Sequence, residues 1–549
     1  MNVMASRERM TAAGLGRVLT AEAVGEAAAK LGVCVRPILR RVTDRQTGAI
    51  EQVTLPCGST RESVCSPCAD KARRLRMQQC AEGWHLAEDP LDDDRGSGDD
   101  ADSDDTDPDV RERRVRSTRR RQDVADLPRV PGEDRSVGRT FTAPDGRTYR
   151  PSMFVTLTLG SYGRIVPGTG TPARPAAYDY RRAALEALHF PKLFDRWMQN
   201  LRRCAAFRVQ YFGAIEPQRR LAPHMHLAIR GAIPRRVLRT VTRATYLQLW
   251  WPPFDTPVFA DPESLPAWNP RTSRVEDDAG VPLMSWEEAL DQLEADPDAE
   301  PAMVMRFGSQ LDIKGIVAPS RDADRTIRYL TKYLAKAVAE AYANPDLEAV
   351  NPAYEAHIDR LHREVRWLPC SPECSNWIRY GIEPRNPGTG LVPGMCGNKA
   401  HDREHLGIGG RRVQVSRAWS GKTLAEHKAD RATVVREVLA AAGIEAPSTD
   451  RIGADVLAED GLPRYVWKPV PAGDASYATT VLLSIAQAKR WRAEYEEARR
   501  RLDDPARAGP VDNRSATTPP RPPDSQPASV ACLAVKGERS ESRSDTKCP

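Results

Sequence analysis

Residues 223–229 read Pro-His-Met-His-Leu-Ala-Ile, a pattern typical of a β-strand with two histidines on one face. Side chains alternate between the faces of a strand, so the imidazoles of His224 and His226 point the same way while Met225 enters the core. Imidazoles at this spacing are good ligands for a divalent metal ion. Any strand can carry two histidines by chance, so the neighbouring residues decide whether this pair is a metal site.

A carboxylate precedes the histidine strand and supplies a third candidate ligand. Glu216 ends a predicted strand over 207–215, and the turn-like residues 217–220 join that strand to the histidines. If the two strands pair as a hairpin, Glu216 reaches the face of His224 and His226. Two imidazoles and a carboxylate on an open sheet would hold Mg²⁺ or Mn²⁺ and leave positions for water and a phosphate. The alternative is that Glu216 is a solvated acid at a strand end.

Tyrosines and lysines repeat at helical spacing in a second motif, Arg-Tyr-Leu-Thr-Lys-Tyr-Leu-Ala-Lys at 328–336. On a helix, Tyr329 and Tyr333 share a face, and Lys332 and Lys336 form an adjacent stripe. A phenol near a metal-bound phosphate can attack it in line and form a phosphotyrosine ester. Nearby lysines would lower the pKa of the phenol and stabilise the developing charge. The alternative is an amphipathic helix that buries two tyrosines.

Eleven cysteines, most of them in two groups, favour metal binding over a disulfide framework. A structural zinc takes four ligands. In the first group we expect Cys34, Cys57, Cys65 and Cys68 to hold zinc, with Cys80 as the alternate. A redox-active Cys-x-x-Cys is the other interpretation, but no thioredoxin-like pattern accompanies it.

The second group has Cys-x3-Cys followed by Cys-x4-His. We expect Cys370, Cys374, Cys396 and His401 to hold a second zinc, with His405 as an alternate ligand. The alternative is a set of unrelated buried cysteines. Three arginines beside this group are predicted to contact DNA phosphates: Arg411, Arg412 and Arg417.

Charge and hydropathy limit the classes of protein that fit this chain. The 549 residues carry a net charge of +6. There is no apolar leader and no apolar stretch long enough to cross a membrane, so we expect a cytoplasmic protein without a membrane partner. Periodicity predicts strands over 154–159, 207–215, 224–229, 304–307 and 311–316, and helices over 11–33, 179–204, 235–250, 322–343, 422–442 and 476–502.

Three stretches in order resemble the HUH endonuclease superfamily: FVTLTLGSYG (154–163), YFGAIEPQRRLAPHMHLAIRG (211–231) and RYLTKYLAK (328–336). More closely, they resemble the RepSA group of rolling-circle replication initiators from actinobacterial plasmids and integrative elements. Sequence similar to this group continues at 56–86, 367–382 and 394–424, so the resemblance covers roughly residues 30–425.

The resemblance implies an α+β HUH domain, with a central antiparallel sheet and flanking helices, that nicks one strand of a plasmid double-strand origin. The 5′ phosphate would stay on tyrosine, and the 3′ hydroxyl would prime synthesis. Motif position favours Tyr333 as the nucleophile, and Tyr329 occupies the place of a second tyrosine or a glutamate that serves termination. The implied partners are origin DNA, single-stranded or in an extruded hairpin, and a host helicase and DNA polymerase.

We expect six segments along the chain. They are an N-terminal zinc-ribbon-like module (1–86), a disordered acidic and basic linker (87–148), the HUH domain (149–345, with an insertion at about 252–302), a Cys/His zinc-like module (346–425), a helical region (426–502) and a disordered tail (503–549).

Two other functions compete with origin nicking. Another HUH enzyme, a single-strand transposase or a relaxase, would cut at a different site. A zinc-stabilised DNA-binding regulator would bind duplex DNA without metal-dependent nicking, and the complete set of Glu, His, His, Tyr and Lys argues against it.

Overall fold

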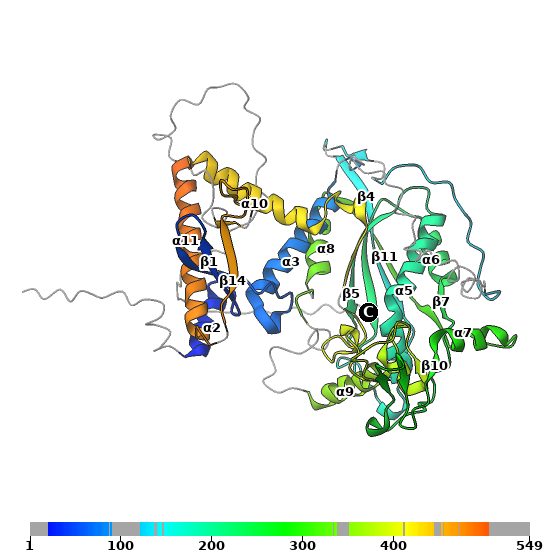
Figure 1. Ribbon diagram of the computed structural model, residues 1–549. Coiled ribbons are helices and arrows are strands. Elements are labelled where there is room, and N and C mark those ends of the chain that lie inside the picture. The colour runs from blue at the N-terminus through cyan, green and yellow to red at the C-terminus, as the bar shows by residue number, and fades with distance from the viewer. Residues whose placement is uncertain are drawn as a thin grey trace, which may run out of the picture.

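The computed structural model describes a mixed α/β protein with a large antiparallel sheet (Figure 1). The described residues are 20–86, 88–89, 121–136, 140–144, 146, 148–332, 334–336, 351–409, 412–443, 452–453, 455–471 and 473–503. Most of the predicted linker, nearly all of the predicted tail and the start of the predicted helix over 11–33 lie outside them. No described helix combines the length and apolarity needed to cross a membrane.

Seven described strands form the main sheet, in the order β13-β5-β6-β4-β11-β7, with β3 paired to β4. Their bounds are β3 Phe141–Thr142, β4 Thr148–Leu159, β5 Gln210–Pro217, β6 Pro223–Arg230, β7 Tyr246–Leu249, β11 Met303–Ala318 and β13 Val413–Val415. All of these pairings are antiparallel. The strands predicted over 154–159, 207–215 and 224–229 are confirmed by β4, β5 and β6.

The two faces of the sheet bury different side chains because successive residues alternate. On one face, Leu157, Met225 and their neighbours pack under helices α5 (Tyr180–Cys204) and α6 (Arg235–Ala244). On the other face, a smaller core lies under α8 (Arg321–Thr331) and the end of α3 (Glu62–Trp84). The histidine pair of β6 is on this second face.

Three predicted elements around β11 differ from the structure. The strands predicted over 304–307 and 311–316 are one continuous strand with a register shift between Phe307 and Leu311. The helix predicted over 235–250 is wrong after Ala244, because residues 246–249 pair with β11 as strand β7. Here pairing with a distant segment overrides local helical spacing.

The predicted insertion at 252–302 is folded. It contains η2 (Pro262–Ser264), β8 (Ala267–Asn269), β9 (Arg274–Glu276), β10 (Met284–Ser285) and α7 (Trp286–Ala295). A capping box between Ser285 and Glu288 begins α7. Strand β10 pairs in parallel with β12 (Ile382–Glu383), which ties the insertion to the segment around the second cysteine group.

The helix predicted over 322–343 ends earlier than expected. Helix α8 stops at Thr331, whose hydroxyl donates to the carbonyls of Ile327 and Arg328. The amide of Lys332 donates to the carbonyl of Tyr329, a tight i to i−3 bond typical of a helix end. The predicted lysine stripe is therefore wrong, because Lys336 lies beyond the helix. Tyr333 and residues 337–343 lie outside the described residues.

The two ends of the described chain form one unit. Strand β1 (Ile38–Asp44) pairs with β2 (Ile50–Leu55) on one side and with β14 (Tyr465–Pro469) on the other. Helices α2 (Ala21–Lys30) and α11 (Tyr477–Asp503) share a small core. Residues 1–86 and 426–502, expected as separate segments, thus contribute strands to the same sheet.

Helices α3 and α10 (Leu424–Ala441) run between this terminal unit and the main sheet (Figure 1). The helices predicted over 422–442 and 476–502 are confirmed by α10 and α11, whereas α3 and α9 (Pro352–Trp367) were not predicted. The buried side chain of Arg230 connects β6 of the main sheet to the end of α3 and to the segment before α10. Its guanidinium donates hydrogen bonds to the carbonyls of Gly83 and Trp419.

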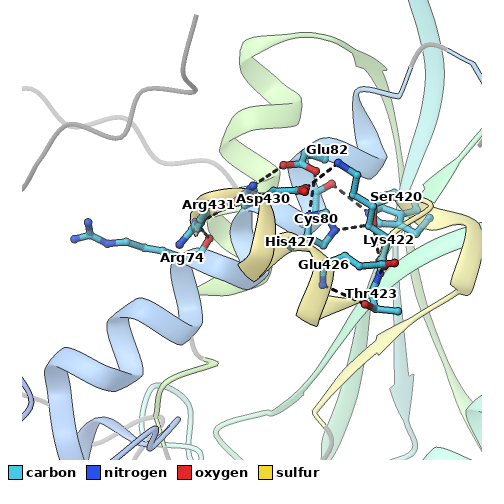
Figure 2. A network of polar contacts seen from close by, with 12 residues as sticks. Arg74, Cys80, Glu82, Ser420, Lys422, Thr423, Glu426, His427, Asp430 and Arg431 are labelled. Carbon is cyan, nitrogen blue, oxygen red and sulfur yellow. Dashed lines mark hydrogen bonds and ion pairs between the residues drawn. The ribbon is translucent and has the colours of Figure 1, made fainter. Parts of the chain in front are cut away.

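A network of hydrogen bonds and ion pairs connects α10 to α3 where the two helices pack together (Figure 2). His427 is fully buried, with its Nδ1 3.0 Å from Glu82 Oε2 and its Nε2 2.9 Å from Ser420 Oγ. Lys422 Nζ lies 2.8 Å from Asp430 Oδ2 at the rim of the same network. A buried imidazole with a polar partner on each side holds both helices in one position.

Replacing His427 by alanine should destabilise the joint between α3 and α10. The change removes the contacts with Glu82 and Ser420 and leaves a cavity at a fully buried position, which costs about 1–3 kcal/mol. A thermal unfolding scan should show a lower midpoint for His427→Ala and an unchanged one for Lys428→Ala, because Lys428 is the exposed next residue of α10. Equal midpoints for the two variants would show that the network does not hold the helices.

Candidate metal centre beside a tyrosine helix

The β5–β6 hairpin brings the three predicted metal ligands together. Glu216 is directly opposite His224 in the antiparallel register, and His226 is two residues further along the same face. One oxygen or nitrogen atom from each of the three side chains lies within 4.8 Å of the others. The sequence-based expectation of one shared face therefore agrees with the geometry.

The donor atoms converge on one point. His224 Nε2 and His226 Nε2 are 2.7 Å apart, and Glu216 Oε2 is 3.8 Å from His226 Nε2. On its other side, His226 Nδ1 lies 2.9 Å from the Thr156 hydroxyl of β4. If Nδ1 carries the proton and donates it to Thr156, the lone pair of Nε2 faces the metal position.

Burial controls the protonation of these groups. Desolvation raises the pKa of Glu216 to about 8, against the opposing charges of Arg412 and Lys332. Desolvation also lowers the pKa of His224 to about 4 and that of His226 to about 3. The imidazoles are thus neutral near pH 7, which is the form that binds a metal ion.

Glu216 is the part of this cluster that most needs a cation. Its Oε1 is buried and has no hydrogen-bond partner among the described residues. A pKa of about 8 leaves Glu216 largely protonated near pH 7, and a divalent cation would displace that proton and satisfy the buried oxygen. Two imidazole nitrogens and a carboxylate are a suitable donor set for Mn²⁺, and the carboxylate for Mg²⁺. The residues present therefore fit a divalent metal ion.

Tyr329 places a phenol at the edge of this cluster. Its hydroxyl lies 3.3 Å from His226 Nε2, although α8 is about a hundred residues away from β6 in the chain. The ring of Phe154 stacks on His226 and meets Tyr329 edge-on, which orients both rings. Tyr329 is 44% exposed, so a ligand from solvent can reach it. Lys332 is exposed at the end of the same helix and acts electrostatically on Glu216.

Thr156 and Phe154 are site residues that sequence reasoning did not identify. Both belong to the Thr-rich strand over 154–159, where alternation assigns them to one face. The sequence could not reveal that β4 pairs with β6, which places Thr156 beside His226 and Phe154 beside Ala228.

The predicted DNA-contacting arginines have different positions. Arg412 lies next to the metal cluster, donates to the carbonyl of Lys336, and has a depressed pKa because of burial. Arg417 is exposed in η5 (Arg417–Trp419). Arg411 lies outside the described residues. Their phosphate contacts remain predictions.

Four cysteine sulfurs meet in the first predicted zinc group. Cys34, Cys57, Cys65 and Cys68 lie within 4.8 Å of one another through their sulfur atoms. The amide of Cys57 donates to Cys34 Sγ at 3.2 Å, which is a bond that stabilises thiolate. The alternate ligand, Cys80, is instead fully buried against Trp419 in the core under the main sheet.

The second predicted zinc group also converges. The sulfurs of Cys370, Cys374 and Cys396 and a nitrogen of His401 lie within 4.8 Å of one another. His401 Nδ1 is 2.6 Å from the carbonyl of Val365, so Nδ1 carries the proton and Nε2 faces the sulfurs. The alternate ligand His405 is not part of this convergent set. Sets of four sulfurs, or of three sulfurs and one imidazole, are donor sets of structural zinc, so both groups could hold Zn²⁺.

Comparison with known proteins identifies the family. The sequence model of the family described as "Replication initiator protein, pSAM2" (RepSA) matches residues 20–488. The chain belongs to the RepSA replication initiator family.

Among curated proteins, this RepSA chain is similar to a "Replication initiator protein" of Streptomyces ambofaciens. The two are 26% identical over 316 residues, which cover 54% of this chain and 55% of that protein. The chain thus aligns with about half the length of this relative. No solved structure matches the RepSA chain.

Metal analysis of the RepSA chain purified without added zinc should find about two zinc ions per chain, because preformed cysteine sites retain zinc. Cys68→Ser and Cys374→Ser should each lose one ion. The matched control is Cys204→Ser, since Cys204 is buried outside both groups and its thiol donates to the carbonyl of Pro128. Absence of zinc from the wild-type protein would remove both sites.

Binding of Mn²⁺ should depend on the hairpin ligands. Titration calorimetry of the zinc-loaded protein should show one additional Mn²⁺ site that His226→Ala abolishes. His362→Ala should leave it unchanged, because His362 is half-buried and bonds the carbonyl of His401 far along the chain from β6. Equal Mn²⁺ binding by wild type and His226→Ala would contradict the assignment.

Proposed function

We propose that this protein initiates rolling-circle replication with an HUH domain that nicks one strand of a plasmid double-strand origin. The observation that carries the proposal is the contact of the Tyr329 hydroxyl with His226 in the buried Glu-His-His cluster. Membership of the RepSA family supports the replication role. Origin DNA, in single-stranded or hairpin form, is the proposed substrate, and a host helicase and DNA polymerase are the proposed partners.

Glu216, His224 and His226 would hold Mg²⁺ or Mn²⁺, which polarises the scissile phosphate and neutralises charge when bound. The phenol oxygen attacks phosphorus and gives up its proton to solvent. The bond from phosphorus to the 3′ oxygen breaks, and that oxygen takes a proton to become the 3′ hydroxyl. Lys332 adds positive potential where negative charge develops.

The two tyrosines have different support. Motif position favours Tyr333, whereas the contact with His226 favours Tyr329. Attack requires a hydroxyl beside Glu216, His224 and His226, and the Tyr329 hydroxyl lies there, so we assign the first cleavage to Tyr329 and the later strand transfer to Tyr333.

Tyr329→Phe should abolish the covalent complex between protein and DNA, because the variant has no hydroxyl at the metal site. The substrate is a supercoiled plasmid with the neighbouring origin, incubated with Mn²⁺ and then denatured to detect attached protein. Tyr333→Phe should still nick but fail to rejoin the strand. Tyr246→Phe is the matched control, since its hydroxyl accepts from Arg121 away from the site.

Normal nicking by Tyr329→Phe together with loss of nicking in Tyr333→Phe would show that Tyr333 makes the first cleavage and Tyr329 the later strand transfer. Normal nicking by the double variant would reject tyrosine chemistry altogether. Mapping the cut to a transfer origin or a transposon end would identify another HUH enzyme instead. Specific duplex binding without any cut would favour the zinc-stabilised regulator.

A further inference from the structure

Helix α8 carries a row of exposed cations on the side that faces away from the sheet. At about 100° per residue, positions 321, 325, 328 and 332 fall within about 60° of one another. These positions are Arg321, Arg325, Arg328 and Lys332, and all four are exposed. The buried residues Ala323, Ile327 and Leu330 lie on the opposite side of the helix. We call the four cations the α8 stripe.

We propose that the α8 stripe binds the phosphate backbone of the single DNA strand that leads into the Tyr329 site. This inference rests on the proposed function. The stripe ends at Lys332, whose charge acts on Glu216, and it borders Tyr329, whose hydroxyl contacts His226. A strand held along α8 therefore reaches the metal centre at the end of the stripe.

The length of the stripe suits several nucleotides. Eleven residues of helix extend about 16 Å. A strand with the B-form rise of about 3.4 Å per nucleotide would place at most roughly four or five phosphates along it, and a more extended single strand would place fewer. Arginine suits this contact because its planar guanidinium binds phosphate oxygens in pairs.

Acidic neighbours leave most of the stripe available to an anion. Asp324 turns toward α3 and lies 3.4 Å from His85. Asp322 lies 3.5 Å from Arg325, but both side chains are more than half exposed. An exposed pair of this kind is worth about 0–1 kcal/mol, so a phosphate can replace the carboxylate.

The test compares two triple variants that remove the same charge from opposite faces of the main sheet. Arg321→Gln, Arg325→Gln and Arg328→Gln together disable the α8 stripe. Arg235→Gln, Arg239→Gln and Arg243→Gln are the matched control, because these exposed arginines are on α6. The probe is a fluorescein-labelled 20-nucleotide strand of mixed sequence, whose anisotropy is followed with the zinc-loaded protein, without added Mg²⁺ or Mn²⁺, at several NaCl concentrations.

The α8 variant should bind at least about tenfold more weakly at 150 mM NaCl. Its slope of log affinity against log salt should fall by about 2, since each single-strand phosphate contact contributes about 0.7. The α6 variant should match the wild type. Asp322→Asn should bind more tightly than the wild type, and this gain does not depend on tolerating three substitutions.

Equal losses in the α8 and α6 variants would reject the proposal, because they would reflect net charge alone. Unchanged binding by the α8 variant would also reject it and would favour an acidic protein partner for this surface. At saturating DNA, the α8 variant should still form the covalent complex. If the wild-type protein forms no covalent complex with DNA, the proposed nicking is rejected. The comparison of DNA binding by the α8 and α6 variants would still decide whether the α8 stripe binds DNA.

Discussion

The burial of Glu216 with His224 and His226 is the constraint on which the rest of this structure depends. Two of these three ionisable side chains come from one strand and the third from its hairpin partner, so backbone pairing alone brings them together. Their burial leaves Glu216 Oε1 without a hydrogen-bond partner among the described residues. The fold therefore pays a desolvation cost that a bound cation would offset.

The surrounding elements give this cluster a fixed position. Phe154 and Thr156 of β4 orient His226 from one side, and Tyr329 approaches from α8 on the other. Helix α8 is packed in turn against α3, whose last turn is joined to the sheet by Arg230. A phenol on a packed helix is held more accurately than one on a loop, and the proposed in-line attack at a phosphate would need that accuracy.

Helix α3 connects the first cysteine group to the side of the sheet that carries the Glu-His-His cluster. The helix is kinked at Cys65 near its start, Cys68 follows the kink, and its end packs under the main sheet beside α8. The first cysteine group is thus joined to a helix that packs on the face of the sheet that carries Glu216, His224 and His226. The second group, through the carbonyl of Val365, is similarly tied to α9. Both cysteine groups are therefore joined to helices that pack in the two cores of the main sheet.

The sequence by itself determined the ligand sets. Alternation in a strand places His224 and His226 on one face, a short turn returns Glu216 to them, and the spacing of cysteines and histidines indicates two groups, each with one candidate more than the four that converge in the structure. These inferences need only local geometry. Tertiary structure alone decided where α8 ends and that residues 246–249 form a strand paired with β11 and not a continuation of α6. It also decided that Tyr329 contacts His226. Those outcomes depend on contacts between segments far apart in the chain, and local periodicity carries no information about which distant surfaces will pack together.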